Sequence, residues 1–167
     1  QFTILLTSQP ASPVIIPVVS SDESEGTVSP TWAMFKESNW SKSQKVTVTG
    51  VNDDYADNDT RYTLLVGPVE SADPEYDGMD PVNFFVTNRD NDSAYVMVSP
   101  LTSLVTTESG IKDTLTFTLS AKPRKKVLIP LSPSDPSEGT VSPDTVRISP
   151  EQWQSSVTAV VTGVNDT

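Results

Sequence analysis

Short runs in which apolar residues alternate with threonine and other polar residues recur along the chain. The clearest are FTILLTS at 2–8, QKVTVTGV at 44–51, TLTFTLS at 114–120 and SVTAVVTGV at 156–164. A period of two places every second side chain on one face, which is typical of half-buried antiparallel strands. Helical spacing of apolar residues is missing, and the 14 prolines further disfavour helices. The pattern predicts an all-β protein.

Turn-forming residues separate the apolar runs and so mark where each predicted strand begins and ends. Taken through one composite unit, the predicted strands are 103–108, 114–120, 127–132, 145–149, 156–164, 61–66 and 82–88. A further run at 94–99 either opens a second unit or splits the strand at 103–108. Short strands separated by turns are typical of an antiparallel β-sandwich of immunoglobulin-like size.

An internal repeat sets the domain organisation. VIIPVVSSDESEGTVSP at 14–30 recurs as VLIPLSPSDPSEGTVSP at 127–143, and VTVTGVNDD at 46–54 recurs as AVVTGVNDT at 159–167, both with an offset of 113 residues. A period of this length fits a whole β-domain. We expect two sandwiches, head to tail: 1–92, lacking its first strand, and 93–167, lacking its last strands. We favour a segment of a longer tandem array over two incomplete units that complete one another between molecules.

Two residue types recur at matching places in both repeats. Pro17 and Pro130 fall inside matching predicted strands, which suggests an edge strand or a bulge because proline donates no ladder hydrogen bond. Trp40 and Trp153 follow polar loops just before the strands at 44–51 and 156–164. We expect them to plug one end of the core; stacking on a carbohydrate is the alternative.

Acidic residues gather in loops that share one end of the predicted sandwich. Strands reverse direction at every connection, so alternate loops lie at the same end. The loop in TGVNDDYADNDTRYT at 49–63 is then expected to meet the loop holding Asp22 and Glu25 and the linker after 88. The acidic residues of the 49–63 loop and the linker are Asp53, Asp54, Asp57, Asp59, Asp90 and Asp92.

Composition narrows the chemistry that these loops can perform. The chain has 22 acidic and 11 basic residues, a net charge of −11, no histidine and no cysteine. This balance argues against nucleic-acid binding, which relies on stripes of Lys and Arg. No apolar run is long enough to span a membrane. The absent His and Cys remove the usual general base, thiolate chemistry and soft-metal ligands, so we expect no enzyme.

Ca²⁺ is the cation that such loops suit best. It accepts six to eight oxygen ligands in irregular geometry, and aspartate, asparagine and backbone carbonyls are all present. An EF-hand does not fit, because counting from Asp53 places Asn58 at position 6 and Leu64 at position 12. The loop at 73–80, at the other end, is a weaker candidate. A solvated acidic loop is one alternative; another is neutralisation by Lys122, Arg124, Lys125 and Lys126 of the next repeat.

The segments TTESG, FTLS, the Trp-containing loop and VTVTGVNDDYADND resemble Calx-beta repeats, including those of long bacterial surface proteins. The resemblance covers nearly the whole chain. It implies Ca²⁺ at a pole of the sandwich, held by a Glu ending the first strand, acids of one loop, an Asp pair and acids of the exit linker. These positions match Glu108, Asp135 or Glu138, Asp53 with Asp54, and Asp90 with Asp92. In the second repeat only Asp166 of the pair is present, and Asp57 and Asp59 are spaced differently from the family pattern.

Three functions remain open from the sequence. The first is a structural or adhesive module of an extracellular or cell-surface protein or filament, stiffened by Ca²⁺ at junctions, with neighbouring repeats or like subunits as partners. The second is a module that binds a glycan or a surface protein through Tyr76 and Trp40. The third, by family analogy alone, is an intracellular calcium sensor.

Overall fold

The computed structural model describes residues 1–165, which form strands, turns and loops without a helix. None of these residues belongs to a helix long and apolar enough to cross a membrane. They divide into two compact units, the first built from 1–53 and 57–90 and the second from 54–56 and 91 onward. The predicted all-β class is confirmed.

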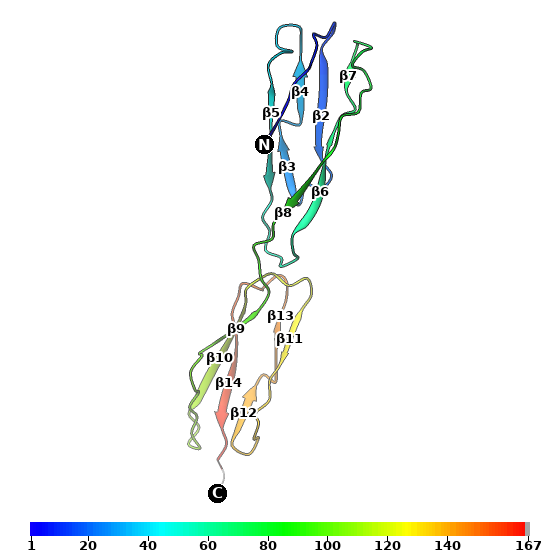
Figure 1. Ribbon diagram of the computed structural model, residues 1–167. Helices are drawn as coiled ribbons and strands as arrows, with labels where there is room; N and C mark the ends of the chain where they lie inside the picture. Colours follow the sequence, from blue (N-terminus) through cyan, green and yellow to red (C-terminus); the bar gives the residue numbers. More distant parts are fainter. Residues whose placement is uncertain (166–167) are drawn as a thin grey trace. The chain divides into compact units, whose positions relative to one another are not determined.

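The first unit is a sandwich of two antiparallel sheets (Figure 1). One sheet has the order β1-β5-β3, and the other has the order β4-β2-β6-β8 with β7 paired to β2. Residues from both sheets, among them Val18, Phe35 and Val46, are fully buried between them. The strands are β1 (Phe2–Ile4), β2 (Val14–Ser20), β3 (Gly26–Ser29), β4 (Trp32–Phe35), β5 (Gln44–Gly50), β6 (Thr60–Val66), β7 (Glu70–Ser71) and β8 (Phe84–Asn88).

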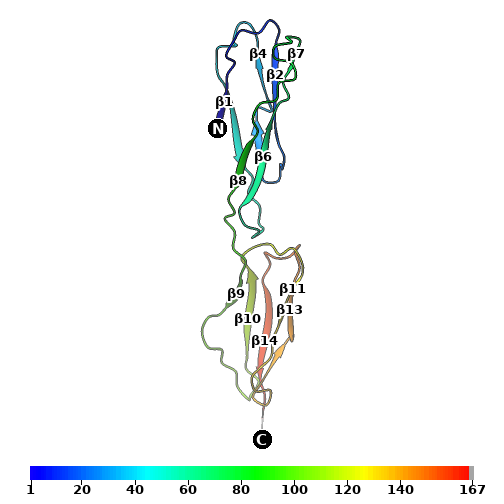
Figure 2. The ribbon, with the colours of Figure 1, turned by 45° about the vertical axis from the view of Figure 1, so that its right-hand side comes forward.

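The second unit has a four-stranded sheet of order β12-β14-β10-β9 and a β11-β13 pair (Figure 2). Its core centres on Phe117, Val146, Ile148 and Ala159, which are all buried. The strands are β9 (Val96–Ser99), β10 (Lys112–Leu119), β11 (Val127–Pro130), β12 (Gly139–Ser142), β13 (Thr145–Ile148) and β14 (Val157–Gly163).

Strand pairing in the two units follows the sequence offset of 113. Gly26 pairs with Gly50 as Gly139 pairs with Gly163, and Val14 pairs with Phe35 as Val127 pairs with Ile148. Phe2 likewise pairs with Val46 as Leu115 pairs with Ala159. Residues that match in sequence therefore occupy matching places in the ladders, and the two units can be compared position by position.

Two of the strand-level predictions differ from the structure. Residues 103–108 form no strand. Instead, Val96–Ser99 pairs with the edge of β10 that faces away from β14. The strands β3 and β12 were not predicted, because each begins at the Gly of a Ser-Glu-Gly and ends at the Ser of a Ser-Pro, and both sequences are turn signals. Each belongs to an extended segment that changes sheets: β3 pairs with β5, while β4, three residues on, pairs with β2.

Pro17 does not lie in an edge strand, but it faces a bulge-like irregularity, so the alternative of a bulge holds on the partner side: between the Ile15–Glu70 and Val18–Val66 pairs, β2 has two residues and its partner segment has three. Strand β2 pairs with β4 through residues 14–17 and with β6 through 18–20, and its alternation of buried and exposed side chains is unbroken. The Val18 N–H faces β4, where it donates to Thr31 O, so the Pro17 nitrogen faces the opposite side, between the β6 and β7 contacts. Pro130 lies in β11, which pairs with β13 alone among the described strands.

Both tryptophans of the repeat pack as core plugs, which confirms the structural expectation for them. Trp40 is partly buried against the core of the first unit and Trp153 against that of the second.

Candidate functional site

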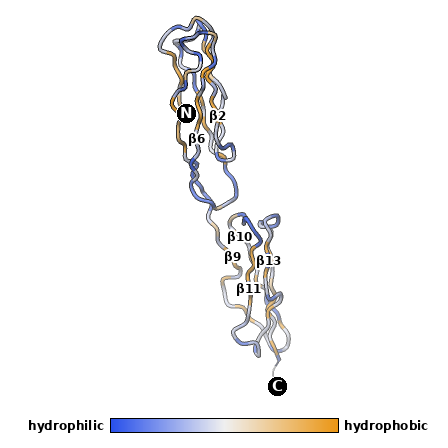
Figure 3. The backbone as a smooth tube through the Cα atoms, turned by 90° about the vertical axis from the view of Figure 1, so that its right-hand side faces the viewer, coloured by the Kyte–Doolittle hydropathy of each residue, from blue (hydrophilic) through white to orange (hydrophobic). Residues whose placement is uncertain are grey.

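Three acidic segments meet at one end of the first sandwich: the turn 21–25 between β2 and β3, the loop 51–59 between β5 and β6 (of which 51–53 and 57–59 belong to this unit), and the residues that follow β8. The Val51 N–H donates to Glu25 O at 3.0 Å. The Asn88 Nδ2 amide donates to Val51 O at 2.7 Å and to Glu25 Oε2 at 3.1 Å. Figure 3 shows this end in the blue of polar residues, whereas the strands carry orange.

Carboxylates of this end hold the loop 51–59 through backbone amides. Asp90 Oδ2 accepts hydrogen bonds from the N–H groups of Asp57 at 2.9 Å and Asn58 at 2.8 Å. The N–H of Asp90 donates to Asp59 Oδ1 at 3.1 Å. Asn58 has a positive φ of 72°, a conformation that asparagine tolerates better than most residues. The carboxylates of Asp90 and Asp59 therefore stabilise the conformation of the loop 51–59.

A second carboxylate motif occurs at matching places in both units. Asp22 Oδ1 accepts from the Ser24 N–H at 3.0 Å and the Ser24 hydroxyl at 2.5 Å. Asp135 Oδ1 accepts from the Ser137 N–H at 2.9 Å and the Ser137 hydroxyl at 2.5 Å. The Ser137 hydroxyl, followed by its backbone N–H, lowers the pKa of Asp135 from its ordinary value. The hydrogen bonds from Ser137 therefore favour the charged carboxylate of Asp135.

Two close approaches fix the strands beside the acidic end. A Cβ atom at Gly26 would stand 2.0 Å from the Tyr62 hydroxyl, and one at Gly50 would stand 2.6 Å from Asn88 Oδ1. Tyr62 is buried, and this burial, together with the nearby charge of Glu25, raises the pKa of its phenol. Glycine at 26 and 50 lets β6 and β8 pack directly on the opposite sheet.

Asp53 and Asp54 follow β5, and both are exposed. Residues 54–56 group with the second unit. There the Lys122 N–H donates to Asp54 O at 2.7 Å. Lys122 Nζ lies 5.2 Å and Arg124 Cζ 5.3 Å from the centroid of the Tyr55 ring, within cation–π range. Within the second unit, the basic loop thus contacts the Asp54 carbonyl and the Tyr55 ring.

The remaining predicted residues belong to the second unit. Asp92 is half-buried. Glu108 and Glu138 line one open cleft of about 630 Å³, together with Gly163 at the end of β14. The N–H of Val164 donates to Glu138 O at 2.9 Å. Asp135 lies three residues before Glu138, in the turn described above, and Asp166 lies outside the described residues.

The donor chemistry of these ends suits Ca²⁺, but their side chains are not gathered as ligands. The side-chain donors are oxygens throughout, which Ca²⁺ prefers. In residues 1–165 no three acidic side chains are grouped so that they could hold a metal ion. The Asp90 and Asp59 oxygens named above point to backbone amides, so a metal would have to compete with those hydrogen bonds.

The loop at 73–80 uses its acids internally. Asp73 is buried, with Oδ1 accepting from the Glu75 N–H at 3.0 Å and Oδ2 from the Ala11 N–H at 2.7 Å. Tyr76 is also buried, and its hydroxyl donates to Ser8 O at 2.7 Å. These contacts fasten the loop to the segment after β1.

Sequence reasoning missed Asn88, Ser24 and Ser137, which hold the acids in place. The serines could have been found, because an identical Ser-Glu-Gly follows Asp22 and Asp135 at the same spacing. Nothing in the sequence pattern marked Asn88. Comparison with protein-family models and with curated proteins finds no match for this chain.

Proposed function

We propose that this chain is a structural or adhesive repeat module of an extracellular or cell-surface protein or filament. Its partners are neighbouring repeats or like subunits, and Ca²⁺ bound at the acidic ends of the repeats stiffens it. The proposal assigns no catalytic role.

The observation that carries the proposal is the convergence of three acidic segments at one end of the first unit. The contacts of Glu25, Asn88 and Asp90 join the turn 21–25, the loop 51–59 and the end of β8. These hydrogen bonds fix the positions of the three segments relative to one another. The matching turn at Asp135 and the cleft between Glu108 and Glu138 bring acids together in the second unit.

We include Ca²⁺ in the proposal because these loops are negatively charged and offer oxygen atoms as ligands. The chain carries a net charge of −11, and its acids are concentrated in these loops. Like charges held close together repel, and a divalent cation would relieve the repulsion. Ligand binding to the folded state alone stabilises it in proportion to the logarithm of ligand concentration over its dissociation constant. Millimolar Ca²⁺ would then be sufficient even for a weak extracellular-grade site.

The alternative of a glycan-binding module has less support. It needs exposed aromatic side chains at the end opposite the acidic loops. Tyr76 is buried there, and Trp40 packs against the core.

Thermal unfolding of the full chain in millimolar Ca²⁺ and in excess chelator tests the proposal. We expect Ca²⁺ to raise Tm by several degrees. Mg²⁺ at the same ionic strength should have a smaller effect, because it prefers tight octahedral sites. Identical curves with Ca²⁺ and chelator would remove the metal from the proposal and leave only the structural role.

A further inference from the structure

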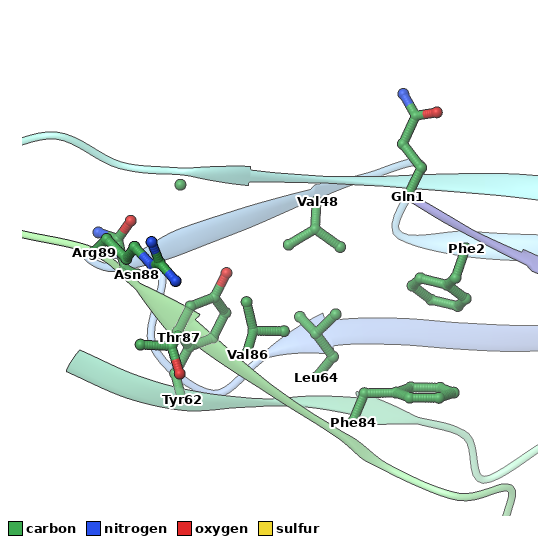
Figure 4. Close-up of a pocket in the computed structure, with 11 residues that line it drawn as sticks. Gln1, Phe2, Val48, Tyr62, Leu64, Phe84, Val86, Thr87, Asn88 and Arg89 are labelled. Carbon is green, nitrogen blue, oxygen red and sulfur yellow. The ribbon is translucent and has the colours of Figure 1, made fainter. Parts of the chain in front are cut away.

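The sheet β4-β2-β6-β8 of the first unit carries apolar side chains on its outer face, the face turned away from β1-β5-β3. Figure 4 shows Leu64 and Val86 pointing into the space between the two sheets. Because side chains alternate along a strand, Leu65 and Phe85 face outward, where they are 42% and 68% exposed. An antiparallel sheet with one solvated face usually presents polar side chains there. This sheet is apolar on both faces.

Strand pairing joins these outward residues into one apolar band, formed by Trp32, Pro17, Val19, Leu65 and Phe85. Trp32 lies directly opposite Pro17, and Val19 lies directly opposite Leu65. Phe85 lies diagonally across from Leu65 on β8. Trp32 is 49% and Val19 47% exposed. Opposite and diagonal neighbours are within side-chain reach of one another, so the band crosses all four strands.

The second repeat shows that the fold does not require the apolar band. At the offset of 113, Val19 corresponds to Ser132 and Trp32 corresponds to Thr145. Strands β11 and β13 nevertheless pair in the same register as β2 and β4. Contiguous exposed apolar patches of this kind mark interaction surfaces, and tryptophan is enriched among the residues that contribute most to binding.

Two opposite charges lie at the two ends of this face. Among the outward positions of β2, β4, β6, β7 and β8, the charged residues are Arg61 and Glu70. The guanidinium Cζ of Arg61 lies 3.9 Å from the centroid of the Phe85 ring. Glu70 lies opposite Ile15, near the start of β2, whereas β6 pairs with the end of β2. The strand rise separates the two charges by roughly 25 Å, too far for them to pair within one chain.

Arg61 and Glu70 also lie in one row. Strand β4 pairs with one side of β2 through residues 14–17, so β7, which pairs with residues 14 and 15, lies on the other side of β2. Strand β6 occupies that same side farther along β2. The outer face therefore has a positive end and a negative end in line with each other, with the apolar band crossing between them.

We propose that this face pairs with the same face of a second copy of the chain, about a two-fold axis that lies in the interface perpendicular to the strands. This rotation reverses the strand direction and keeps each row above its own counterpart. It brings the Arg61 end of one copy over the Glu70 end of the other. The face is then self-complementary, as a two-fold interface requires. Two Arg61–Glu70 pairs flank the joined apolar bands.

Charge favours a second copy as the occupant. The chain carries a net charge of −11, which opposes association through its acidic surfaces. On the outer face the charges of Arg61 and Glu70 balance, so two copies meet there with little repulsion. The pairing rests on the proposed structural role, in which like subunits are partners, and it names the surface that they share.

The size of the apolar band sets the strength of the contact. Two sheets pack face to face about 10 Å apart, which brings their outward side chains into contact. An apolar patch of about 500 Å² per copy gives an interface of roughly 1,000 Å² in total, the size of a weak and reversible complex. We therefore expect a dissociation constant on the order of 100 μM.

Sedimentation equilibrium of the full chain, from about 10 μM to about 1 mM, tests the pairing. We expect a reversible equilibrium between monomer and dimer. Val19→Ser and Trp32→Thr introduce the residues found at the matching places of the second repeat, and each should weaken the dimer at least roughly tenfold. The control Leu128→Ser alters an outward apolar residue of β11 that is 58% exposed, and should leave the dimer unchanged.

Charge reversal tests the orientation of the two copies. Arg61→Glu and Glu70→Arg should each weaken the dimer, because like charges would then face one another. The double variant should restore it, since opposite charges meet again. The two positions do not reach one another within one chain, so this rescue reports a contact between copies. A double variant weaker than either single variant would overturn the arrangement.

Two further results would overturn the pairing itself. One is a dimer that withstands both Val19→Ser and Trp32→Thr. The other is a chain that stays monomeric at about 1 mM; a response of its Trp32 fluorescence to neutral oligosaccharides would then assign the face to a glycan. The effect of Ca²⁺ on Tm is measured on dilute protein, well below the expected dissociation constant. A monomer with a Ca²⁺-dependent Tm therefore contradicts the pairing and leaves the proposed function standing.

Discussion

The backbone N–H of Asp57 donates to Asp90 Oδ2 at 2.9 Å, which joins the loop 51–59 to the residue two positions beyond β8. Asp90 in turn donates its own N–H to Asp59. Within the first unit, a cluster that would otherwise be repulsive is thus held by reciprocal hydrogen bonds between carboxylates and backbone amides.

Removing the Asp90 carboxylate should destabilise the first unit. Asp90→Ala leaves two backbone N–H groups without this acceptor, and we expect a loss of about 1–3 kcal/mol in the free energy of unfolding. Asp90→Asn keeps one oxygen acceptor and should lose less. Denaturant unfolding measures both. Glu23→Ala, which removes an exposed acid from the same end, should change stability by under about 0.5 kcal/mol; an equal loss there would mean that net charge, not the hydrogen bonds, matters.

Gly26 and Gly139 form a matched pair for a steric test. A Cβ at Gly26 would stand 2.0 Å from the Tyr62 hydroxyl, whereas the nearest atom to a Cβ at Gly139 is 3.6 Å away. Gly26→Ala must displace Tyr62, and overpacking of this kind costs about 1–3 kcal/mol. Gly139→Ala should be neutral or slightly stabilising, because alanine restricts the unfolded chain. Thermal unfolding compares the two variants. Equal effects would contradict the placement of Tyr62 over Gly26.

Tyr62 should titrate above its ordinary pKa of 10.0 because of burial and the charge of Glu25. The raised pKa favours the neutral phenol in the folded state. The resulting stability is complete below the pKa of the unfolded chain and is lost as pH rises through the higher folded value. The difference in phenolate absorbance between the wild type and Tyr62→Phe isolates this residue from the other tyrosines. Glu25→Gln should move the pKa downward; an unchanged titration would exclude the contribution of Glu25.

Asp135 should titrate below its ordinary pKa of 3.8, chiefly because the Ser137 hydroxyl donates to it. A lowered pKa contributes stability above the unfolded pKa, and this contribution is lost as pH falls through the folded value. Ser137→Ala should raise the pKa of Asp135 toward 3.8, measured by NMR of the side-chain carboxyl. Ser132→Ala, in the same unit but outside the turn, serves as the control. A pKa that did not respond to Ser137→Ala would leave only the backbone amide as its cause.

The fold class was predictable because alternation alone reveals which side chains face the core. Val14, Ile16 and Val18 alternate with less buried neighbours along β2, as the sequence pattern requires. The chain reversals that bring Glu25 and Asp90 to one end also follow from counting antiparallel strands. The offset of 113 also matches residues 1–54 with residues 114–167 in sequence, so the strands of one repeat could be inferred from those of the other.

Other features depended on contacts that a linear pattern does not carry. The segment 103–108 reads as a strand because it contains Leu104, Val105 and Thr106, yet it forms no strand. The segment 26–31 reads as a turn because of Gly26 and Pro30, yet its residues Gly26–Ser29 form β3 and pair with β5. The role of Asn88 depends on its approach to Gly50 across the sandwich. Tertiary packing decides such cases.

Calcium titration of the full chain, followed residue by residue by amide NMR, tests the central claim that the converging acidic segments form a cation-binding structural end. The account predicts saturable shift changes at 22–25, 53–59 and 88–90, accompanied by a rise in Tm and weakened by Asp90→Ala. Shifts that are absent at millimolar Ca²⁺, or spread evenly over exposed acids such as Glu23 and Glu37, would contradict it.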